Sequence, residues 1–396
     1  MPIASPFHER TAALCTSLLW KDWAGFHAVC SFDICHEREY FAIRHSAGLL
    51  DVTPLFKYDV RGKDAAAFLS RVMVRDIARL KIGRVTYSCW CDDDGKMLDD
   101  GTVQRLDSEH YRVTSAEPTF RWFMHNTRRF DVTIEDVTER IAGLALQGPT
   151  SRQILRECTD LDMDRFRYFR VKSAQIAGVD VTISRTGYTG DLGFEIWCRN
   201  EDALTVWDAV VEAGRPHGLT PIGLDALDVA RVEAGYILAG VDYYAADQCT
   251  IEARKSTPYQ LDLGWTVDLA RAPFIGQTAL RREWAHGPTH GFVGLEIDWL
   301  ELERLYGAHD LPPDLPSHAW RTPTPVYNQS GLQIGRASSG TWSPTLKKNL
   351  ALASVEAAYA PIGTELQIEQ TVEYVRHTVT ATVVDKPFFD PTRKRA

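Results

Sequence analysis

The stretch RTGYTGDLGFE, residues Arg185 to Glu195, decides the fold, because a glycine-rich turn joins two alternating apolar runs there. The runs at residues 179–184 and 192–198 predict two strands with a turn between them. Side chains alternate across a strand, so Gly193, Glu195 and Trp197 share one face. We therefore expect a carboxylate between a side-chain-free gap and an indole, which can hold a flat heterocycle through paired N–H bonds.

The alternative interpretation of Glu195 is a solvent-exposed acid on a half-buried hairpin, and spacing alone favours it. The glycines follow the spacing G-x-x-G-x-x-G, and a strand rather than a helix comes next. This pattern does not match the dinucleotide fingerprint. It therefore argues against a phosphate-binding loop.

Composition excludes several classes of function. The 396 residues carry 44 Lys and Arg against 53 Asp and Glu, a net charge of −9, which does not favour nucleic acid as a partner. No apolar run is long enough to span a bilayer, so we expect a cytoplasmic protein without a membrane partner. The 8 cysteines form no CxxC pair and the 12 histidines show no ligand spacing, so no metal site is predicted.

A second stretch that contains candidate functional residues is a predicted β-hairpin at residues 84–103. Asp94-Gly95 is a strong turn signal. Folding at this turn brings Asp99 and Asp100 back toward Tyr87. Adjacent strand residues point to opposite faces, so only one of the two acids can face a pocket.

The remaining pattern predicts an α+β chain of roughly three units. Helices are expected at residues 37–47, 63–74, 201–213 and 224–234. The last third is β-rich, with strands expected at residues 263–267, 291–297, 331–336 and 378–384. A Pro-rich stretch at residues 311–316 is expected to lie on the surface, and the polar segment 242–256 has no clear period.

Several separated stretches together resemble one family, the folate-dependent aminomethyltransferase (glycine-cleavage T-protein) superfamily. They follow the family's order along nearly the whole chain, which makes the resemblance specific. The matching stretches are residues 42–52, 87–88, 98–100, 146–149, 184–195, 223–235, 257–258 with Trp265, 274–276, 339–346 and 386–388.

The resemblance implies a three-domain clover-leaf around a central channel that holds tetrahydrofolate. The implied domains are a discontinuous folate-binding domain at residues 1–51 and 141–256, a second α+β domain at 52–140, and a C-terminal β-rich domain at 257–396.

The resemblance also assigns roles to residues of this chain. Glu195 is expected to bind the pterin ring, with Tyr188 close by. Asp100 is expected to approach the N5/N10 edge where the one-carbon unit is exchanged, and is the predicted catalytic residue. Tyr87 and Trp265 are expected to line the folate pocket.

The chain departs from the T-protein pattern at three places. Leu227 replaces an arginine, Gln260 replaces a glutamate, and Thr53-Pro54 replaces a Ser-His pair. A cavity without these groups is less suited to an aminomethyl-lipoyl arm. Such changes fit the branch of the superfamily that removes methyl groups from O-methyl or S-methyl compounds.

Aromatic content favours an aryl methyl ether of the vanillate, syringate or dicamba type as the donor. The predicted substrate-binding residues are Tyr40, Leu227, Gln260 and Trp342. The partner of the leaving group stays open among His36, His45 and Tyr40. The partner molecule is then a small methyl donor, and the chain is a monomer or homodimer.

The sequence thus predicts a tetrahydrofolate-dependent demethylase that yields 5-methyltetrahydrofolate. Three alternatives remain open: an aminomethyltransferase of glycine cleavage, a non-catalytic folate-binding protein, and the folate domain of a flavin-linked amine dehydrogenase.

Overall fold

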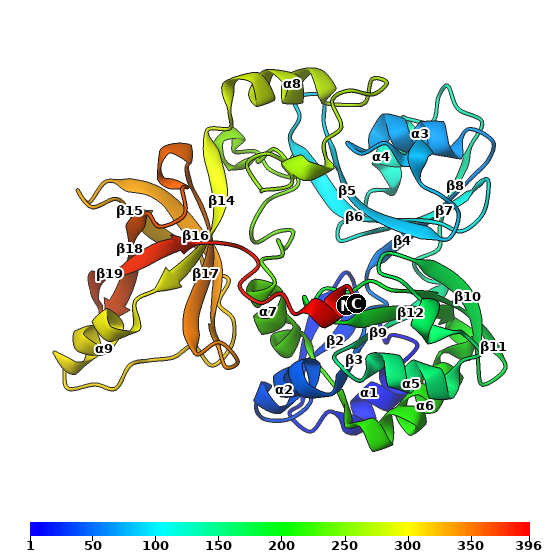
Figure 1. Cartoon of the computed structure of the whole chain (residues 1–396), viewed down its shortest axis with the longest axis horizontal. Helices are drawn as coiled ribbons and strands as arrows, with labels where there is room; N and C mark the ends of the chain where they lie inside the picture. The colour runs from blue at the N-terminus through cyan, green and yellow to red at the C-terminus, as the bar shows by residue number, and fades with distance from the viewer.

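The computed structural model describes residues 1–396 and contains three large β-structures and one small hairpin (Figure 1). A six-stranded sheet, a five-stranded sheet and a closed six-stranded barrel follow one another around the molecule. The hairpin pairs β1 (Leu19–Trp23) with β2 (Phe26–Ser31). The predicted α+β class with a β-rich C-terminal part is confirmed.

The six-stranded sheet contains the end of the glycine-rich stretch, and helices pack on both of its faces. Its strands lie in the order β10 (Val171–Ile176), β11 (Val179–Ser184), β12 (Gly193–Arg199), β9 (Ile141–Gln147), β3 (Ala47–Asp51) and β13 (Leu219–Pro221). Its helices are α1 (His8–Leu14), α2 (Glu37–His45), α5 (Ser151–Cys158), α6 (Ala203–Gly214) and α7 (Leu224–Glu233).

The alternation predicted for β12 separates two hydrophobic clusters. Phe194, Ile196 and Cys198 belong to the cluster that also contains Trp207 of α6. Trp197, on the opposite face, belongs to the cluster beneath α2 and α7. The two-residue period of β12 therefore places Glu195 on the same side as Trp197.

The five-stranded sheet holds the predicted Asp hairpin. Its strands lie in the order β5 (Arg84–Cys91), β6 (Met97–Arg105), β7 (His110–Ser115), β4 (Phe56–Arg61) and β8 (Thr133–Asp136), with helices α3 (Ala65–Val72) and α4 (Phe120–His125). The turn at Asp94-Gly95 is confirmed, and Gly95 has a φ of 73°, a conformation that glycine adopts without strain. Asp99 pairs with Trp90 and Asp100 with Cys89 across the hairpin.

The barrel closes the C-terminal part of the chain. Its strands are β14 (His290–Ile297), β17 (Lys348–Glu356), β16 (Gln333–Ser343), β15 (Thr324–Tyr327), β18 (Glu365–Val372) and β19 (Val375–Val384), and α9 (Trp299–Gly307) lies beside it. The Pro-rich stretch 311–316 is largely exposed, as predicted.

The strand predicted at residues 263–267 is wrong. These residues form a 3₁₀ turn, η6 (Gly264–Thr266), in which the Thr266 hydroxyl donates to the carbonyl oxygen of Leu263 at 2.7 Å. An apolar alternation makes a strand only where a neighbouring strand offers hydrogen bonds, and none pairs with this segment.

Residues between α7 and the barrel cover the five-stranded sheet rather than the barrel alone. Leu261, Leu263 and Phe274 join Cys89 and Cys91 in one buried cluster, and α8 (Gln277–His286) lies near β5 in Figure 1. The two cysteines are thus part of an apolar core. The proposed domain limits at residues 51, 140 and 256 stay a prediction.

A buried ion network joins α7 to the barrel. The Arg231 guanidinium donates to Asp242 at 2.7 Å and to Asp228 at 2.6 Å, and all three side chains are at most 5% exposed. The hydroxyls of Ser338 and Ser339 on β16 donate to the other Asp242 oxygen. A buried charge is tolerated when it is paired and hydrogen-bonded, and Asp242 satisfies both conditions.

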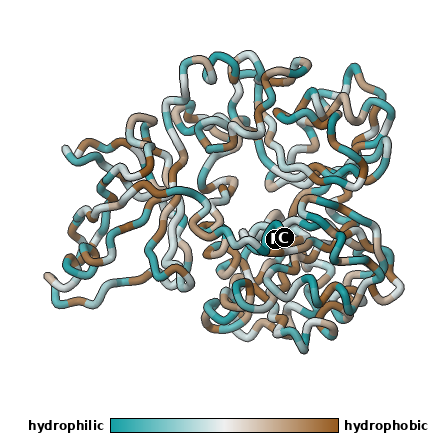
Figure 2. The backbone as a smooth tube through the Cα atoms, in the orientation of Figure 1, coloured by the Kyte–Doolittle hydropathy of each residue, from teal (hydrophilic) through white to brown (hydrophobic).

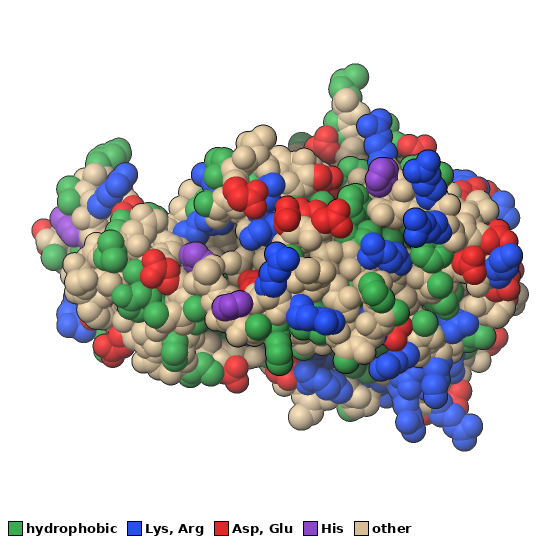
Figure 3. All heavy atoms as spheres, turned by 90° about the horizontal axis from the view of Figure 1, so that it is seen from above, with side chains coloured by type: hydrophobic (Ala, Val, Ile, Leu, Met, Phe, Trp, Pro, Cys, Tyr) green, Lys and Arg blue, Asp and Glu red, His purple; other side chains and the backbone are tan.

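Hydropathy and charge are unevenly distributed over the molecule. Apolar stretches run along many strands, and hydrophilic ones occur in connecting loops (Figure 2). Lys and Arg side chains gather on the right of the face seen in Figure 3, over the half that holds the five-stranded sheet. None of the helices combines the length and the apolar character that crossing a bilayer requires.

Candidate functional site

Glu195 is held by hydroxyl groups on one oxygen and left open on the other. Its Oε2 accepts hydrogen bonds from Thr186 at 2.8 Å and from Ser184 at 3.3 Å. Oε1 accepts no hydrogen bond from the protein, and it is not fully enclosed by protein atoms. The half-buried carboxylate therefore has one oxygen free for a ligand N–H.

Burial raises the pKa of Glu195 above its ordinary value, and the hydrogen bonds from Thr186 and Ser184 oppose that rise. These two hydroxyls therefore favour the charged carboxylate. The arrangement fits an acceptor of N–H groups better than a surface acid, so the alternative of an exposed glutamate is not what the structure shows.

The gap predicted beside Glu195 does not exist. A Cβ on Gly193 would lie 2.1 Å from Oε1 of Gln147, and one on Gly187 would lie 1.9 Å from the same atom. The buried Gln147 amide fills this space and donates to the carbonyl oxygens of Thr186 and Phe194. The expectation that glycine leaves room for a ring here is wrong, because a side chain from β9 occupies it.

The predicted indole cover is also wrong. Trp197 is 2% exposed and packs in the core. The Nζ atom of Lys57 lies 5.8 Å from its ring centroid. The aromatic surface beside the site comes from other residues.

The substitution Gly193→Ala should lower the free energy of unfolding by about 1–3 kcal/mol, because the new methyl group would displace Gln147 from a packed position. Thermal or urea unfolding of the purified variant measures this. Gly307→Ala is the matched control, since a Cβ there meets no atom within 4 Å. Equal stability of both variants would show that Gln147 moves without cost.

The second part of the site is a carboxylate pair bridged by tyrosines. Asp99 is 1% exposed, whereas Asp100 is half-buried, so only Asp100 faces an accessible space, as predicted. The Tyr87 hydroxyl donates to Oδ2 of Asp100 at 2.7 Å. The Tyr243 hydroxyl lies 3.0 Å from Oδ1 of Asp99 and closer still to Oδ1 of Asp100. Its single proton serves one acid at a time.

Both acids titrate at higher pH than ordinary aspartates. Burial raises the pKa of Asp99, and the charge of Asp100 adds to the rise. Burial also raises the pKa of Asp100, against the opposing hydrogen bonds from Tyr243 and Tyr87. Two close carboxylates resist holding two negative charges, so the pair readily shares a proton. Such a pair is suited to proton transfer.

Aromatic rings line the space beside Asp100. The Trp265 ring stacks on Tyr87 with centroids 6.0 Å apart and planes at 21°, and Trp265 is 63% exposed. Tyr188 stacks on Tyr236 at 5.6 Å and donates its hydroxyl to the carbonyl oxygen of Ile237. Flat apolar surfaces of this kind bind ring systems.

Tyr188 belongs to the glycine-rich turn and lies close enough to Asp100 for its charge to act on the tyrosine. Burial raises the pKa of Tyr188 well above its ordinary value, Arg231 opposes the rise, and the charge of Asp100 adds to it. The structure therefore brings together Tyr87, Asp100, Tyr188 and Trp265. Glu195 lies on the strand that follows the same turn.

These groups fit tetrahydrofolate. The open Oε1 of Glu195 can accept from the N–H groups of a pterin. The exposed Trp265 ring and Tyr87 offer stacking surface. Asp100, with its raised pKa, offers a site for a proton next to an amine nitrogen. The roles themselves stay predictions.

The predicted substrate-binding residues lie in other places. Tyr40 is fully buried, and its hydroxyl donates to Glu233 and lies 2.7 Å from the Thr345 hydroxyl, so no surface is left for a substrate. Trp342 packs against Trp299 of α9 at 5.2 Å. The prediction that Tyr40 contacts a substrate is wrong, because it supports the packing of α2 against α7 and the barrel.

The other two predicted substrate-binding residues, Gln260 and Leu227, have neutral side chains. The Gln260 side chain is hydrogen-bonded to the backbone N–H of Thr257 and to the hydroxyl of Thr289. Leu227 is half-buried and packs against the cluster that contains Trp197. Neither residue contacts Asp100 or Glu195 by a hydrogen bond.

Sequence reasoning missed Tyr243. It lies in the polar segment 242–256, 143 positions from Asp100. The preceding residue, Asp242, is fixed by Arg231, Ser338 and Ser339. The only signal was the Tyr243-Tyr244 pair inside a polar stretch, which does not indicate a partner.

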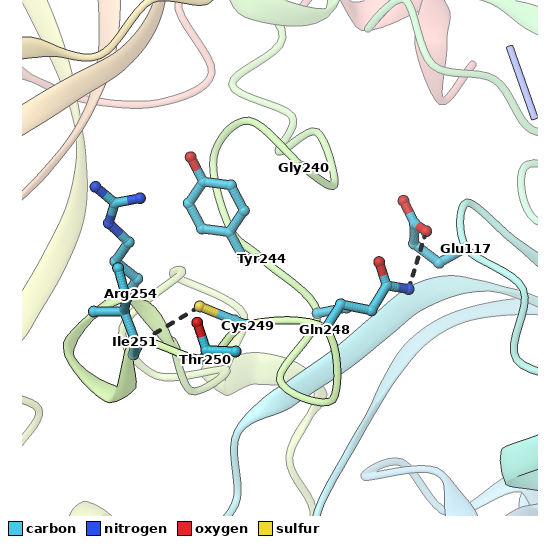
Figure 4. Close-up of a pocket in the computed structure, with 9 residues that line it drawn as sticks. Glu117, Gly240, Tyr244, Gln248, Cys249, Thr250, Ile251 and Arg254 are labelled. Carbon is cyan, nitrogen blue, oxygen red and sulfur yellow. Dashed lines mark hydrogen bonds between the residues drawn. The ribbon is translucent and has the colours of Figure 1, made fainter. Parts of the chain in front are cut away.

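The same segment also lines a cavity of about 300 Å³ (Figure 4). Tyr244 and Arg254 extend in the same direction from its wall, and the Gln248 amide donates to Glu117. Of these two consecutive tyrosines, Tyr243 is hydrogen-bonded to the carboxylate pair and Tyr244 lines the cavity. The full lining is Glu117, Gly240, Tyr244, Ala245, Gln248, Cys249, Thr250, Ile251 and Arg254.

Comparison with known proteins gives matches over nearly the whole chain. A family model described as the GCVT N-terminal domain matches residues 7–271, and one described as the glycine cleavage T-protein C-terminal barrel domain matches residues 312–390. An aminomethyltransferase of Caldanaerobacter subterraneus subsp. tengcongensis is 34% identical over 381 residues, covering 94% of this chain and 93% of the relative.

Two further similarities agree. An aminomethyltransferase of Clostridium botulinum (strain Okra / Type B1) is 35% identical over 380 residues, covering 94% of each chain. The crystal structure of glycine cleavage system aminomethyltransferase T from Bartonella henselae superposes with a TM-score of 0.83 at 23% identity, covering 98% of this chain and 99% of that one. The latter similarity supports the fold.

Proposed function

The chain belongs to the glycine cleavage T-protein family of tetrahydrofolate-dependent transferases, and on that premise we propose that it transfers an aminomethyl-derived one-carbon unit to tetrahydrofolate. The observation that carries the proposal is Asp100, half-buried between the hydroxyls of Tyr87 and Tyr243. The relatives named aminomethyltransferase support this donor over the aryl methyl ether predicted from the sequence.

In this proposal each group of the chain has a defined task. Glu195 accepts N–H bonds from the pterin through its open Oε1. Tyr87 and Trp265 support its rings by stacking. Asp100 accepts a proton at the reacting nitrogen, and Tyr243 lets Asp99 share that proton. Bound tetrahydrofolate supplies the amine that accepts the one-carbon unit.

Removal of a methyl group from an O-methyl or S-methyl compound is the second candidate. Leu227 and Gln260 favour it, because an apolar side chain and a neutral amide stand where the T-protein pattern has an arginine and a glutamate. A cavity without these two charged groups is less suited to an aminomethyl-lipoyl arm.

One assay separates the candidates. The protein is mixed with tetrahydrofolate and either an aminomethyl-lipoyl carrier protein or a panel of aryl methyl ethers, dimethylsulfoniopropionate and methylamines. Ammonia with 5,10-methylenetetrahydrofolate supports the proposal, and 5-methyltetrahydrofolate supports the second candidate. Folate binding without either product contradicts both.

A pH profile tests the role of the tyrosine bridge. Tyr243→Phe removes a hydrogen bond that lowers the pKa of Asp100, so that pKa should rise further. If Asp100 acts in its ionised form, the acidic limb of kcat/KM then moves to higher pH. Tyr244→Phe is the matched control and should leave the limb in place. An unmoved limb in Tyr243→Phe argues against Asp100 as the titrating group.

A further inference from the structure

Arg75 is a half-buried cation without an acidic partner at the edge of the aromatic pair. It lies in the loop after α3. Its Cζ atom is 5.5 Å from the Trp265 ring centroid. Its only hydrogen bond is a long one, 3.5 Å, to the carbonyl oxygen of Tyr87. A guanidinium has five N–H donors, so most of its capacity is unused.

Arg44, Arg112 and Arg271 have more partners than Arg75. Arg112 pairs with Asp59 at 2.8 Å, and Arg44 pairs with Glu233. Arg271 donates to the carbonyl oxygens of Ser70 and Met73. Burial lowers the pKa of Arg75, and no nearby acid offsets this effect. The free protein thus leaves this charge without an acidic partner to offset its desolvation.

The position of Arg75 relative to Asp100 is defined by Tyr87. The hydroxyl of Tyr87 bonds Asp100, and the backbone carbonyl of the same residue faces Arg75. The two charges therefore lie at opposite ends of one tyrosine. Trp265 stacks on Tyr87 and also lies against the Arg75 guanidinium. A ligand that begins at Asp100 and extends along the two rings ends at a cation.

Tetrahydrofolate has this order of groups. Its reacting nitrogens are followed by a benzoyl ring and then by a glutamate with two carboxylates. We propose that Arg75 binds a glutamate carboxylate of tetrahydrofolate, while the benzoyl ring lies along Trp265. The assignment rests on the proposed function, because it places the reacting nitrogens at Asp100. A planar guanidinium binds a carboxylate through two parallel N–H bonds, which a lysine cannot reproduce.

The test combines one substitution with one change of ligand. Binding of tetrahydrofolate is compared with binding of its analogue in which both glutamate carboxyls are carboxamides. Isothermal titration calorimetry gives Kd for the native protein, Arg75→Gln and Arg75→Lys. Arg128→Gln, an exposed arginine after α4, is the matched control for charge.

The native protein and Arg128→Gln should bind tetrahydrofolate about 10-fold more tightly than the carboxamide analogue, as expected for a lost charge-assisted pair. Arg75→Gln should bind both ligands equally, with little change for the analogue. Arg75→Lys should retain only part of the preference. These results would show that Arg75 and the glutamate act on each other.

Three results would overturn the inference. One is equal affinity of the native protein for both ligands. A second is a preference that survives in Arg75→Gln. A third is the same loss for both ligands in Arg75→Gln, which indicates a structural role. The native protein can be compared with the two ligands even if the variant is unstable. Failure of the native protein to bind either ligand would overturn the proposed function as well, which separates the two failures.

Discussion

Replacing Asp100 with asparagine is expected to lower kcat by about 10²- to 10⁴-fold, the usual contribution of a positioned acid or base. Affinity for tetrahydrofolate should stay close to that of the native protein. The amide has nearly the same shape, and its oxygen can still accept from one tyrosine. Its NH₂ group can donate to the hydroxyl of the other tyrosine, because a hydroxyl both donates and accepts. The proton acceptor is lost, but the packing is not.

The measurement pairs kcat from the product assay with Kd from calorimetry. Asp93→Asn is the control, because Asp93 lies exposed in the turn of the same hairpin. A fall in kcat and affinity by equal factors would assign Asp100 to binding alone. A variant with native turnover would exclude Asp100 from the chemistry.

The second large effect is expected from Glu195→Ala. Loss of a charge-assisted hydrogen bond to the pterin should weaken tetrahydrofolate binding by about 1.5–3 kcal/mol, or about 10- to 150-fold in Kd. Thr186 and Ser184 would lose their acceptor, yet they lie 2.8 Å apart and can bond each other. The fold should therefore tolerate the change.

Calorimetric titration of Glu195→Ala with tetrahydrofolate checks this expectation. Glu201→Ala, in the exposed turn after β12, is the control. Glu195→Gln keeps the side-chain length but removes the charge, and should fall between the native protein and the alanine variant. Unchanged affinity in Glu195→Ala would remove this carboxylate from the folate site.

Local patterns predicted much of the fold. The alternation around Glu195 and the Asp94-Gly95 turn act over a few residues, and the structure contains both the strand β12 and the hairpin β5–β6. The separation of Asp99 from Asp100 followed from the two-residue period of a strand. The family resemblance extended these local results to the whole chain.

Long-range contacts explain the failures. Gln147 fills the space over Gly193, and the alternating pattern of β12 contains no information about a side chain from β9. Tyr243 reaches the carboxylate pair from a segment without periodicity. The segment 263–267 alternates like a strand, yet no neighbour pairs with it.

The prediction of a methyl ether donor rested on the aromatic content of the chain and on its departures from the T-protein pattern. The aromatic residues whose number favoured an aryl methyl ether are dispersed through the structure. Trp90, Phe120 and Trp122 belong to the core of the five-stranded sheet, and Trp342 on β16 packs against Trp299 of α9. The replacements at Leu227, Gln260 and Thr53-Pro54 remain as the support for that donor.

Asp242 and Tyr243 give this enzyme a constraint on domain exchange. Asp242 is hydrogen-bonded to two serines of the barrel, and Tyr243 is hydrogen-bonded to the Asp99–Asp100 pair. A chimera that takes its barrel from a relative would therefore alter the position of Tyr243 beside Asp99 and Asp100. It would keep that position only if the new barrel has hydroxyls equivalent to those of Ser338 and Ser339. Recombination breakpoints in this family should respect that pair, even though neither serine is hydrogen-bonded to Asp99 or Asp100.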